Sequence, residues 1–226
     1  MAFTRQRLGK RVVFVFFVLM KKETFPLWAY GLLMLSIAGL MAITTILPQF
    51  DFIVWLQSTN SDTEIKLLQF ISDSINFFSL GIPFIIMIVG EFNKKKKKKT
   101  RLSFVYVGLS IAIAGLISYI IKNIALVDRP YEIDHRIIQW SVGGGFSFPS
   151  GHTTEAFAAA TALTFLFPKW KFTIPLFLWA SLVAFSRVYL GVHYPFDILG
   201  GIAIGVTSSY FLHSIFRMKT EIFEYQ

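Results

Sequence analysis

Long uncharged runs of apolar residues recur along the 226-residue chain, and shorter polar segments separate them. Three runs contain no charged residue at all: Leu27 to Leu47, Leu102 to Ile121 and Ile198 to Phe216. A helix of about 20 apolar residues crosses the hydrocarbon core of a bilayer, so each of these runs predicts a membrane-spanning helix.

Three further apolar segments are shorter or less uniform, at about Ile75 to Gly90, Thr153 to Phe167 and Phe172 to Phe185. Together the runs predict an all-α, polytopic membrane protein with six transmembrane helices in one bundle. The whole chain, 1–226, then forms a single integral-membrane domain. The outer loop from Pro48 to Ser74 is apolar enough to predict short helices that lie on the membrane interface.

The early run "VVFVFFVLM", Val12 to Met20, is too short to span a bilayer. The residues that follow it, "KKETFP", lack the small side chains of a signal-peptide cleavage site. We therefore expect either an interfacial N-terminal helix or an extension of the first span.

Composition supports the membrane interpretation. Hydrophobic residues make up 54% of the chain and charged residues only 15%, and there are 25 phenylalanines. A soluble domain of this size could not bury so many apolar side chains in its core. The chain has no cysteine, which excludes disulfides and thiolate metal sites.

The net charge of +9 is distributed unevenly between the two predicted membrane faces. With six spans, both termini and the run Lys94 to Lys99 share one face, which carries 17 of the 22 basic residues. The positive-inside rule places that face in the cytoplasm and the three opposite loops outside. The lysine run is then a topology anchor that faces anionic lipid headgroups, and no nucleic-acid partner is expected.

Three of the five basic residues on the outer face lie where spans end. Lys122 and Arg129 are seven residues apart, so they share one helix face if the third span continues past Ile121. Arg187 ends the fifth span. Each residue alone is typical of a snorkelling side chain at a helix end, but in a bundle the three cations would converge.

The segment "SRVYLGVHYPFD" places a histidine before the last span. Pro195 suits the first turn of a helix, and Asp197 follows His193 by four residues, within reach of its imidazole. A carboxylate that accepts the Nδ1 proton leaves the Nε2 lone pair exposed. This arrangement predicts that His193 is a nucleophile or a base.

The stretch "FPSGHTTE" begins the fourth span with a turn. The free amide groups and the positive dipole end of a helix start bind anions, and Gly151 allows close approach while Ser150 can donate a hydroxyl. His152 then stands in the first turn, beside the anion. Taken alone the turn is an ordinary capped helix start.

The three cations, the anion-binding turn and the two histidines together suit phosphoryl transfer, in which charge on the phosphoryl oxygens must be balanced during in-line attack. Fixed cations can balance that charge, so neither a metal nor another cofactor is expected. The few carboxylates nearby would serve a metal poorly.

Three segments resemble the signature motifs of the type-2 phosphatidic acid phosphatase superfamily, K-x6-R-P, P-S-G-H and S-R-x5-H-x3-D. They are "KNIALVDRP", "PSGH" and "SRVYLGVHYPFD", and they match in order and without substitution over 122–197. The resemblance implies an integral-membrane lipid phosphatase of the bacterial type, which needs no metal.

The resemblance also implies a role for each matched residue. His193 attacks phosphorus to form a phosphohistidine, Asp197 orients it, and His152 protonates the leaving oxygen and then helps to activate water. The phosphate-binding residues implied by the motifs are Lys122, Arg129, Ser150, Gly151 and Arg187.

Several polar residues lie outside the motifs. Glu155 either raises the pKa of His152 or favours the helix start, of which we expect the second. His135 and His213 are expected to be structural. The glycines Gly143 to Gly145 predict a flexible loop at the mouth of the site.

The expected substrate is undecaprenyl diphosphate or phosphatidylglycerophosphate in the outer leaflet of a bacterial inner membrane, since the motifs face the periplasmic or extracellular side. A lipid A phosphatase, a phosphatidic acid phosphatase and a noncatalytic lipid-phosphate binding or transport relative are the alternatives. The high hydropathy argues against a soluble vanadate-dependent haloperoxidase. The scarcity of charged residues in the spans argues against a transporter, which would place polar residues near the middle of the bilayer. The sequence does not indicate an oligomeric state.

Overall fold

A computed structural model describes residues 26–58, 61–93 and 95–219, and all regular structure in these ranges is helical. The interfacial helix predicted at Val12–Met20 lies outside the described residues. The helices are α2 (Leu27–Ile46), α3 (Gln49–Gln57), α4 (Asp62–Asp73), the π-helical turn η1 (Phe77–Gly81), α5 (Ile82–Glu91), α6 (Lys97–Ala125), α7 (Pro130–Ile133), α8 (Gly151–Leu166), α9 (Trp170–Tyr189) and α10 (Pro195–Lys219).

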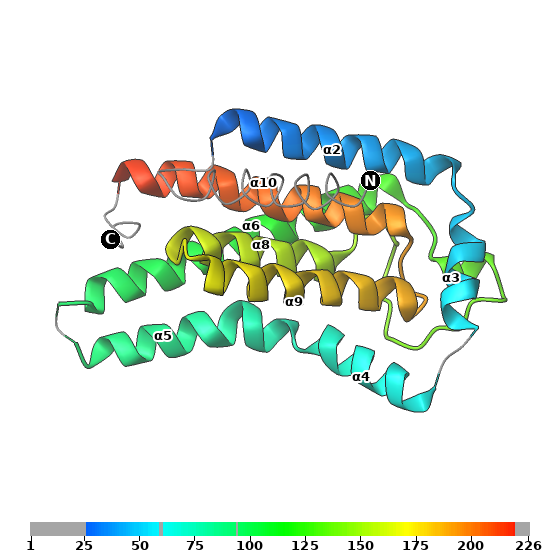
Figure 1. Cartoon of the computed structure of the whole chain (residues 1–226), viewed down its shortest axis with the longest axis horizontal. Coiled ribbons are helices and arrows are strands. Elements are labelled where there is room, and N and C mark those ends of the chain that lie inside the picture. Colours follow the sequence, from blue (N-terminus) through cyan, green and yellow to red (C-terminus); the bar gives the residue numbers. More distant parts are fainter. Residues whose placement is uncertain (1–25, 59–60, 94, 220–226) are drawn as a thin grey trace, which may run out of the picture.

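Helix α8 forms the centre of the bundle. It packs against α6, α9 and α10, while α2 lies on the outer side of α10 and α5 lies beside α6 (Figure 1). Helix α4 packs against the end of α9, and η1 joins it to α5. The long helices run roughly parallel to one another, as a bundle in a membrane requires.

Small residues explain why α8 is central. Five of its alanines are fully buried, and they face different neighbours around the helix: Ala156, Ala158, Ala159, Ala160 and Ala162. On α10, a Cβ at Gly205 would lie 2.4 Å from the Thr154 carbonyl oxygen, so only glycine allows this backbone contact. Small residues at helix interfaces allow the close packing that helps helices to associate in lipid.

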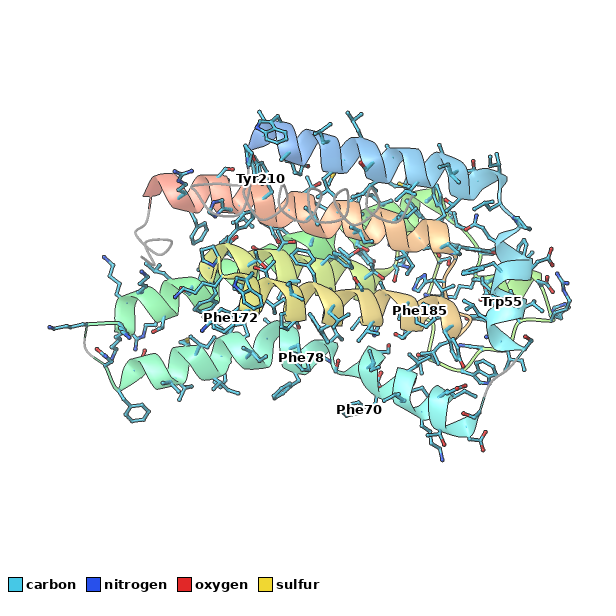
Figure 2. The ribbon with its side chains drawn as sticks, viewed as in Figure 1. Trp55, Phe70, Phe78, Phe172, Phe185 and Tyr210 are labelled. Carbon is cyan, nitrogen blue, oxygen red and sulfur yellow. The ribbon has the colours of Figure 1, made fainter. Side chains whose placement is uncertain are left out.

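The chain is a multi-pass membrane protein. Five segments are long and apolar enough to cross a bilayer among the described residues: Leu27–Ile46, Asp62–Glu91, Lys97–Ile133, Trp170–Tyr189 and Pro195–Arg217. The predicted fourth span corresponds to α8, which has 16 residues and is not among them. The count of six spans therefore stays a prediction. Apolar side chains line the outside of the bundle, including Phe172 and Phe185 on α9 (Figure 2).

The two ends of the bundle differ in character. At one end, Glu91 pairs with Lys97 at 2.8 Å and with Arg101 beside the lysine run. At the other end, α3, α4 and the segment 126–150 cover the helix termini. Gln57 of α3 holds this cover in place, since its amide accepts from Ile138 N and donates to the carbonyls of Ile138 and Tyr189.

Candidate active site

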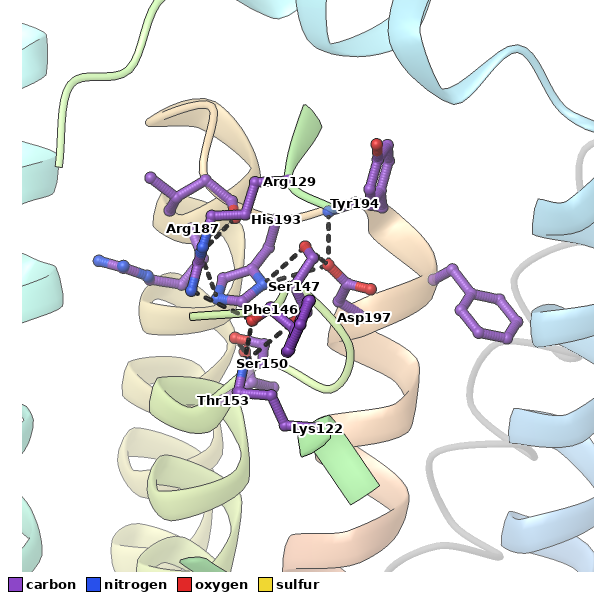
Figure 3. A network of polar contacts seen from close by, with 12 residues as sticks. Lys122, Arg129, Phe146, Ser147, Ser150, Thr153, Arg187, His193, Tyr194 and Asp197 are labelled. Atoms are coloured by element: carbon purple, nitrogen blue, oxygen red, sulfur yellow. Dashed lines mark hydrogen bonds and ion pairs between the residues drawn. The ribbon is translucent and has the colours of Figure 1, made fainter. Parts of the chain in front are cut away.

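The residues of the three motifs meet at the covered end of the bundle, opposite the lysine run (Figure 3). Lys122 lies in the last turn of α6, and Arg187 lies in the last turn of α9. Ser150 precedes α8, and His193 occupies the turn between α9 and α10. Four helices that are separate in sequence thus bring their ends together at one place.

The sequence-based route to this convergence was partly wrong. Helix α6 does continue past Ile121, which the shared face required, but it ends at Ala125. Leu126 then adopts a left-handed conformation with φ of 51°, and Arg129 follows in extended backbone. Lys122 and Arg129 therefore do not share a helix face, and the turn at Leu126 brings Arg129 into the site instead.

His193 and Asp197 form the buried pair that their spacing predicts. Nδ1 of His193 lies 3.1 Å from Oδ2 of Asp197, and both side chains are at most 3% exposed. The same Oδ2 accepts the Tyr194 backbone N–H at 3.0 Å. A carboxylate at this position favours the tautomer with hydrogen on Nδ1, which leaves the lone pair on Nε2.

Ser147 belongs to the same network, although the sequence patterns did not single it out. Its hydroxyl donates to Oδ2 of Asp197 at 2.5 Å and lies 3.4 Å from Nδ1 of His193. Its carbonyl accepts a hydrogen bond of 3.1 Å from Nζ of Lys122. The only available signal was its place three residues before Ser150.

Arg129 is held by the backbone of the glycine loop. Nε donates to the carbonyl of Gly145 at 2.9 Å, and Nη2 donates to those of Gly144 and Phe146 at 2.8 and 3.3 Å. Nη1 donates to Val192 O at 2.7 Å and approaches His193. Lys122 is bound similarly, with Nζ 2.5 Å from the Phe146 carbonyl oxygen. The carbonyls of residues 144–147 thus occupy N–H groups of Arg129 and Lys122 that an anion could otherwise use.

Arg187 has a different set of partners. Its Nη1 donates to the hydroxyls of Ser72 and Ser141, at 2.6 and 3.0 Å, and Nη2 donates to Val142 O at 3.2 Å. Nε is buried and has no hydrogen-bond partner among the described residues. Because buried donors are rarely left unsatisfied, this N–H is available to a ligand. Ser72 comes from α4, outside the three motifs, and the sequence patterns did not indicate it.

The start of α8 has the form that its sequence predicts. The helix begins at Gly151, and Ser150 is the residue before it. The Ser150 amide donates to the carbonyl of Asp197 at 3.1 Å, which ties α8 to α10. The first amides of a helix have no acceptor within it, and a Cβ at Gly151 would meet nothing within 4 Å, so this backbone is open to an anion.

The surroundings of both histidines favour the neutral imidazole, and both residues lie outside the five candidate spans. Burial lowers the pKa of His193 to about 4, although Asp197 acts in the opposite direction. Burial also lowers the pKa of His152 to about 3, and the neighbouring positive charges, led by Arg187, lower it further. A neutral imidazole has the free lone pair that a nucleophile or a base requires.

Other polar residues lie outside the network. Glu155 follows the first turn of α8, beyond the positions where a helix dipole acts strongly, and forms no hydrogen bond or ion pair within the described residues. Glu155 is also not among the groups that shift the pKa of His152. Neither a role in raising that pKa nor a role at the helix start therefore gains support. Arg136 pairs with Asp51 and Asp134, and His213 stacks on Phe165.

Comparison with known families gives a match that includes all three motifs. The sequence model of the PAP2 superfamily matches residues 103–221, more than half of the chain. The chain belongs to the PAP2 superfamily. The matched region runs from α6 to the end of α10 and so contains every predicted site residue. Ser72 and the rest of α4 lie outside it.

Individual members of the superfamily are similar to this chain over part of their length. Undecaprenyl-diphosphatase BcrC of Bacillus subtilis is 36% identical over 125 residues, which cover 54% of this chain and 61% of that protein. Lipid A 4'-phosphatase of Bacteroides thetaiotaomicron is 44% identical over 69 residues, 30% of this chain and 31% of that protein. The similarity thus spans less than two thirds of these relatives.

A solved structure shares the fold. The transmembrane PAP2-type phosphatidylglycerolphosphate phosphatase from Bacillus subtilis superimposes with a TM-score of 0.66 over 85% of this chain and 96% of that one, at 21% identity. The helical bundle is therefore the fold of a PAP2 membrane phosphatase.

Proposed function

We propose that this protein is a lipid phosphatase of the membrane, which removes phosphate from a lipid monophosphate or diphosphate through a phosphohistidine. The observation that carries the proposal is the buried pair of His193 and Asp197 with Arg129 beside it. The pair prepares a nucleophilic nitrogen, and Lys122 and Arg187 add positive charge for the phosphoryl oxygens.

The first step forms a bond between Nε2 of His193 and phosphorus and breaks the bond from phosphorus to the lipid oxygen. His152 gives its proton to that oxygen, so the lipid alcohol or lipid phosphate leaves neutralised by one proton. Asp197 stabilises the positive imidazole of the phosphohistidine. In the second step His152 takes a proton from water, which attacks phosphorus and releases inorganic phosphate and free His193.

His152 can act as an acid only when it is protonated, and its surroundings lower its pKa to about 3. The nearby cations contribute to this low pKa, and a bound phosphate would offset their charge. Substrate binding then raises the pKa of His152, or the phosphate itself carries the proton into the site. By either route, substrate binding supplies the protonated His152 that the first step requires.

The proposed phosphate site comprises Lys122, Arg129 and Arg187, with Ser150 and the Gly151 amide. Balancing the phosphoryl charge with fixed cations should allow turnover without a metal or another cofactor. The whole chain, 1–226, acts as one domain in this proposal.

The proposed substrate is undecaprenyl diphosphate or phosphatidylglycerophosphate, and the relatives named undecaprenyl-diphosphatase support the first of these. Relatives named lipid A phosphatase keep that lipid as an alternative. The site lies opposite the lysine run, so the positive-inside rule supports a site on the outer side of the membrane, with both termini in the cytoplasm.

Release of phosphate from purified protein in detergent tests the function. Undecaprenyl diphosphate, phosphatidylglycerophosphate, lipid A and phosphatidic acid are supplied in turn, each with excess EDTA, to the wild type and to His193→Ala. We expect one lipid to be preferred and the variant to lose about a thousandfold or more of the rate. Activity only with added metal contradicts the mechanism, and binding without turnover of any lipid indicates the noncatalytic alternative.

A second experiment tests on which side of the membrane the site lies. The chain has no cysteine, so a single introduced cysteine gives a unique labelling position. A Cβ at Gly144 would meet nothing within 4 Å, so Gly144→Cys should fold normally. A membrane-impermeant maleimide should label this variant on intact cells. Labelling only after lysis would place the site in the cytoplasm.

A further inference from the structure

Ser147 is fixed between two of the three motifs. It is fully buried, and its backbone N–H donates to the Val127 carbonyl at 2.6 Å. Its own carbonyl accepts from Lys122. The end of α6 thus determines where the Ser147 backbone lies, and with it where the hydroxyl points.

The Ser147 hydroxyl bonds to side chains of the proposed catalytic pair. It donates its hydrogen to Oδ2 of Asp197 at 2.5 Å, so at 3.4 Å from Nδ1 of His193 it can only accept. Both of the groups facing Nδ1 are therefore acceptors, which requires the hydrogen to be on Nδ1. The lone pair is left on Nε2, the nitrogen that Arg129 approaches.

Asp197 receives three donors on one oxygen: Nδ1 of His193, the Tyr194 amide and the Ser147 hydroxyl. Each hydrogen bond to a carboxylate stabilises its charge and reduces the charge that it presents to other partners. Removing the Ser147 donor would leave Asp197 more strongly attracted to a positive His193.

We propose that Ser147 is a positioning residue of this site, which fixes the tautomer and orientation of His193 through Asp197 and couples that pair to the phosphate-binding Lys122. The inference rests on the proposed function. Partners that orient a metal-ligating histidine typically change affinity or activity by about 10-fold to 100-fold when removed, and we expect an effect of this size for Ser147.

A purely structural serine would act differently. Ser110, also fully buried, donates its hydroxyl to the Tyr106 carbonyl one turn away on α6 at 2.9 Å. No hydrogen bond joins Ser110 to the motif residues within the described part of the chain. Ser110→Ala is therefore the matched control, because it removes the same hydroxyl from an equally buried position.

The test compares Ser147→Ala, Ser147→Cys and Ser110→Ala by kcat, KM and pH profile. The affinity for vanadate, used as a phosphate analogue, checks that the site is folded. The cysteine variant keeps the side-chain volume but lacks a strong donor. We expect kcat to fall about 10-fold to 100-fold in both Ser147 variants, with KM and vanadate affinity within about threefold of the wild type. Ser110→Ala should behave like the wild type in all four measurements.

The pH profile distinguishes positioning from packing. Without the Ser147 donor, Asp197 stabilises protonated His193 more strongly and so raises the pKa of His193. In the Ser147 variants the acidic limb of kcat/KM should therefore move to higher pH by roughly half a unit to one unit. Wild-type behaviour of Ser147→Cys, or a slower enzyme with an unmoved acidic limb, would overturn the proposal. If His193→Ala is as active as the wild type, the proposed function itself fails, and that result is independent of Ser147.

Discussion

Nη1 of Arg129 lies 3.5 Å from Nε2 of His193, so the guanidinium stands directly beside the nitrogen proposed to attack phosphorus. The remaining donors of this arginine are bound to carbonyls of Gly144, Gly145, Phe146 and Val192. A phosphate placed at His193 must compete with these carbonyls for the same N–H groups. We therefore expect the geometry of the glycine loop to affect phosphate affinity.

Gly143 and Gly144 give a matched pair of substitutions in that loop. A Cβ at Gly143 would lie 3.0 Å from three guanidinium atoms of Arg129, whereas a Cβ at Gly144 would meet nothing within 4 Å. We expect Gly143→Ala to displace Arg129 and lower kcat/KM by about 10-fold to 100-fold, because misplacement by less than about 1 Å is costly at a reacting centre. Gly144→Ala should stay within about twofold of the wild type. Equal effects in the two variants would contradict the contact.

The lowered pKa of His193 predicts how kcat/KM depends on pH. Burial lowers its pKa from the ordinary 6.5 to about 4, and the neutral form is the proposed nucleophile. As pH falls from 7 the neutral form persists until the pH approaches 4, so kcat/KM should remain high through pH 5. An acidic limb centred between about pH 6 and 7, where an unperturbed histidine titrates, would disagree with this environment.

Ser72 predicts a contribution of α4 to phosphate binding. Its hydroxyl accepts from Nη1 of the buried Arg187 at 2.6 Å. In Ser72→Ala, Ser141 is the acceptor that Nη1 keeps, so Arg187 is held less firmly. Loss of one hydrogen bond to a charged group should raise the inhibition constant of vanadate, used as a phosphate analogue, by about tenfold. Ser110→Ala serves again as the buried control. An unchanged inhibition constant in Ser72→Ala would show that Ser141 suffices to hold Arg187.

Packing of α8 on α10 predicts a stability difference. Gly205→Ala would place a methyl group 2.4 Å from the Thr154 carbonyl oxygen, so the helices must separate. We expect a loss of about 1–3 kcal/mol in the free energy of unfolding, seen as a lower midpoint in detergent melts. Gly115→Ala on α6, where a Cβ meets nothing within 4 Å, should not lower the midpoint. Similar melts for both variants would contradict the close contact.

Local patterns in the sequence predicted much of this architecture. Apolar runs located the long helices, and the i,i+4 spacing predicted the bond between His193 and Asp197 that the structure contains. The start of α8 at Gly151 and of α10 at Pro195 also followed from capping chemistry. These features depend on residues close together in the chain.

Features that depend on distant residues or on loop geometry were missed. A continuous helix from Lys122 to Arg129 would have put both side chains on one face. A left-handed Leu126 ends α6 first, and no glycine in the sequence marks that turn. Ser147 reaches Asp197 across 50 residues, and Ser72 reaches Arg187 across 115. No local period encodes such contacts. Glu155 shows the same limit: it forms no hydrogen bond or ion pair within the described residues, and packing sets its surroundings.

Trapping the phosphorylated enzyme tests the central claim that His193 is the nucleophile. An aryl phosphate labelled with ³²P needs no proton for its leaving group, so His152→Ala should accept the phosphoryl group yet release it slowly for lack of a base. After an alkaline quench and digestion, we predict an acid-labile label on the peptide that contains His193, stronger in His152→Ala than in the wild type and absent from His193→Ala. A label on another residue, or one that persists in His193→Ala, would contradict the account.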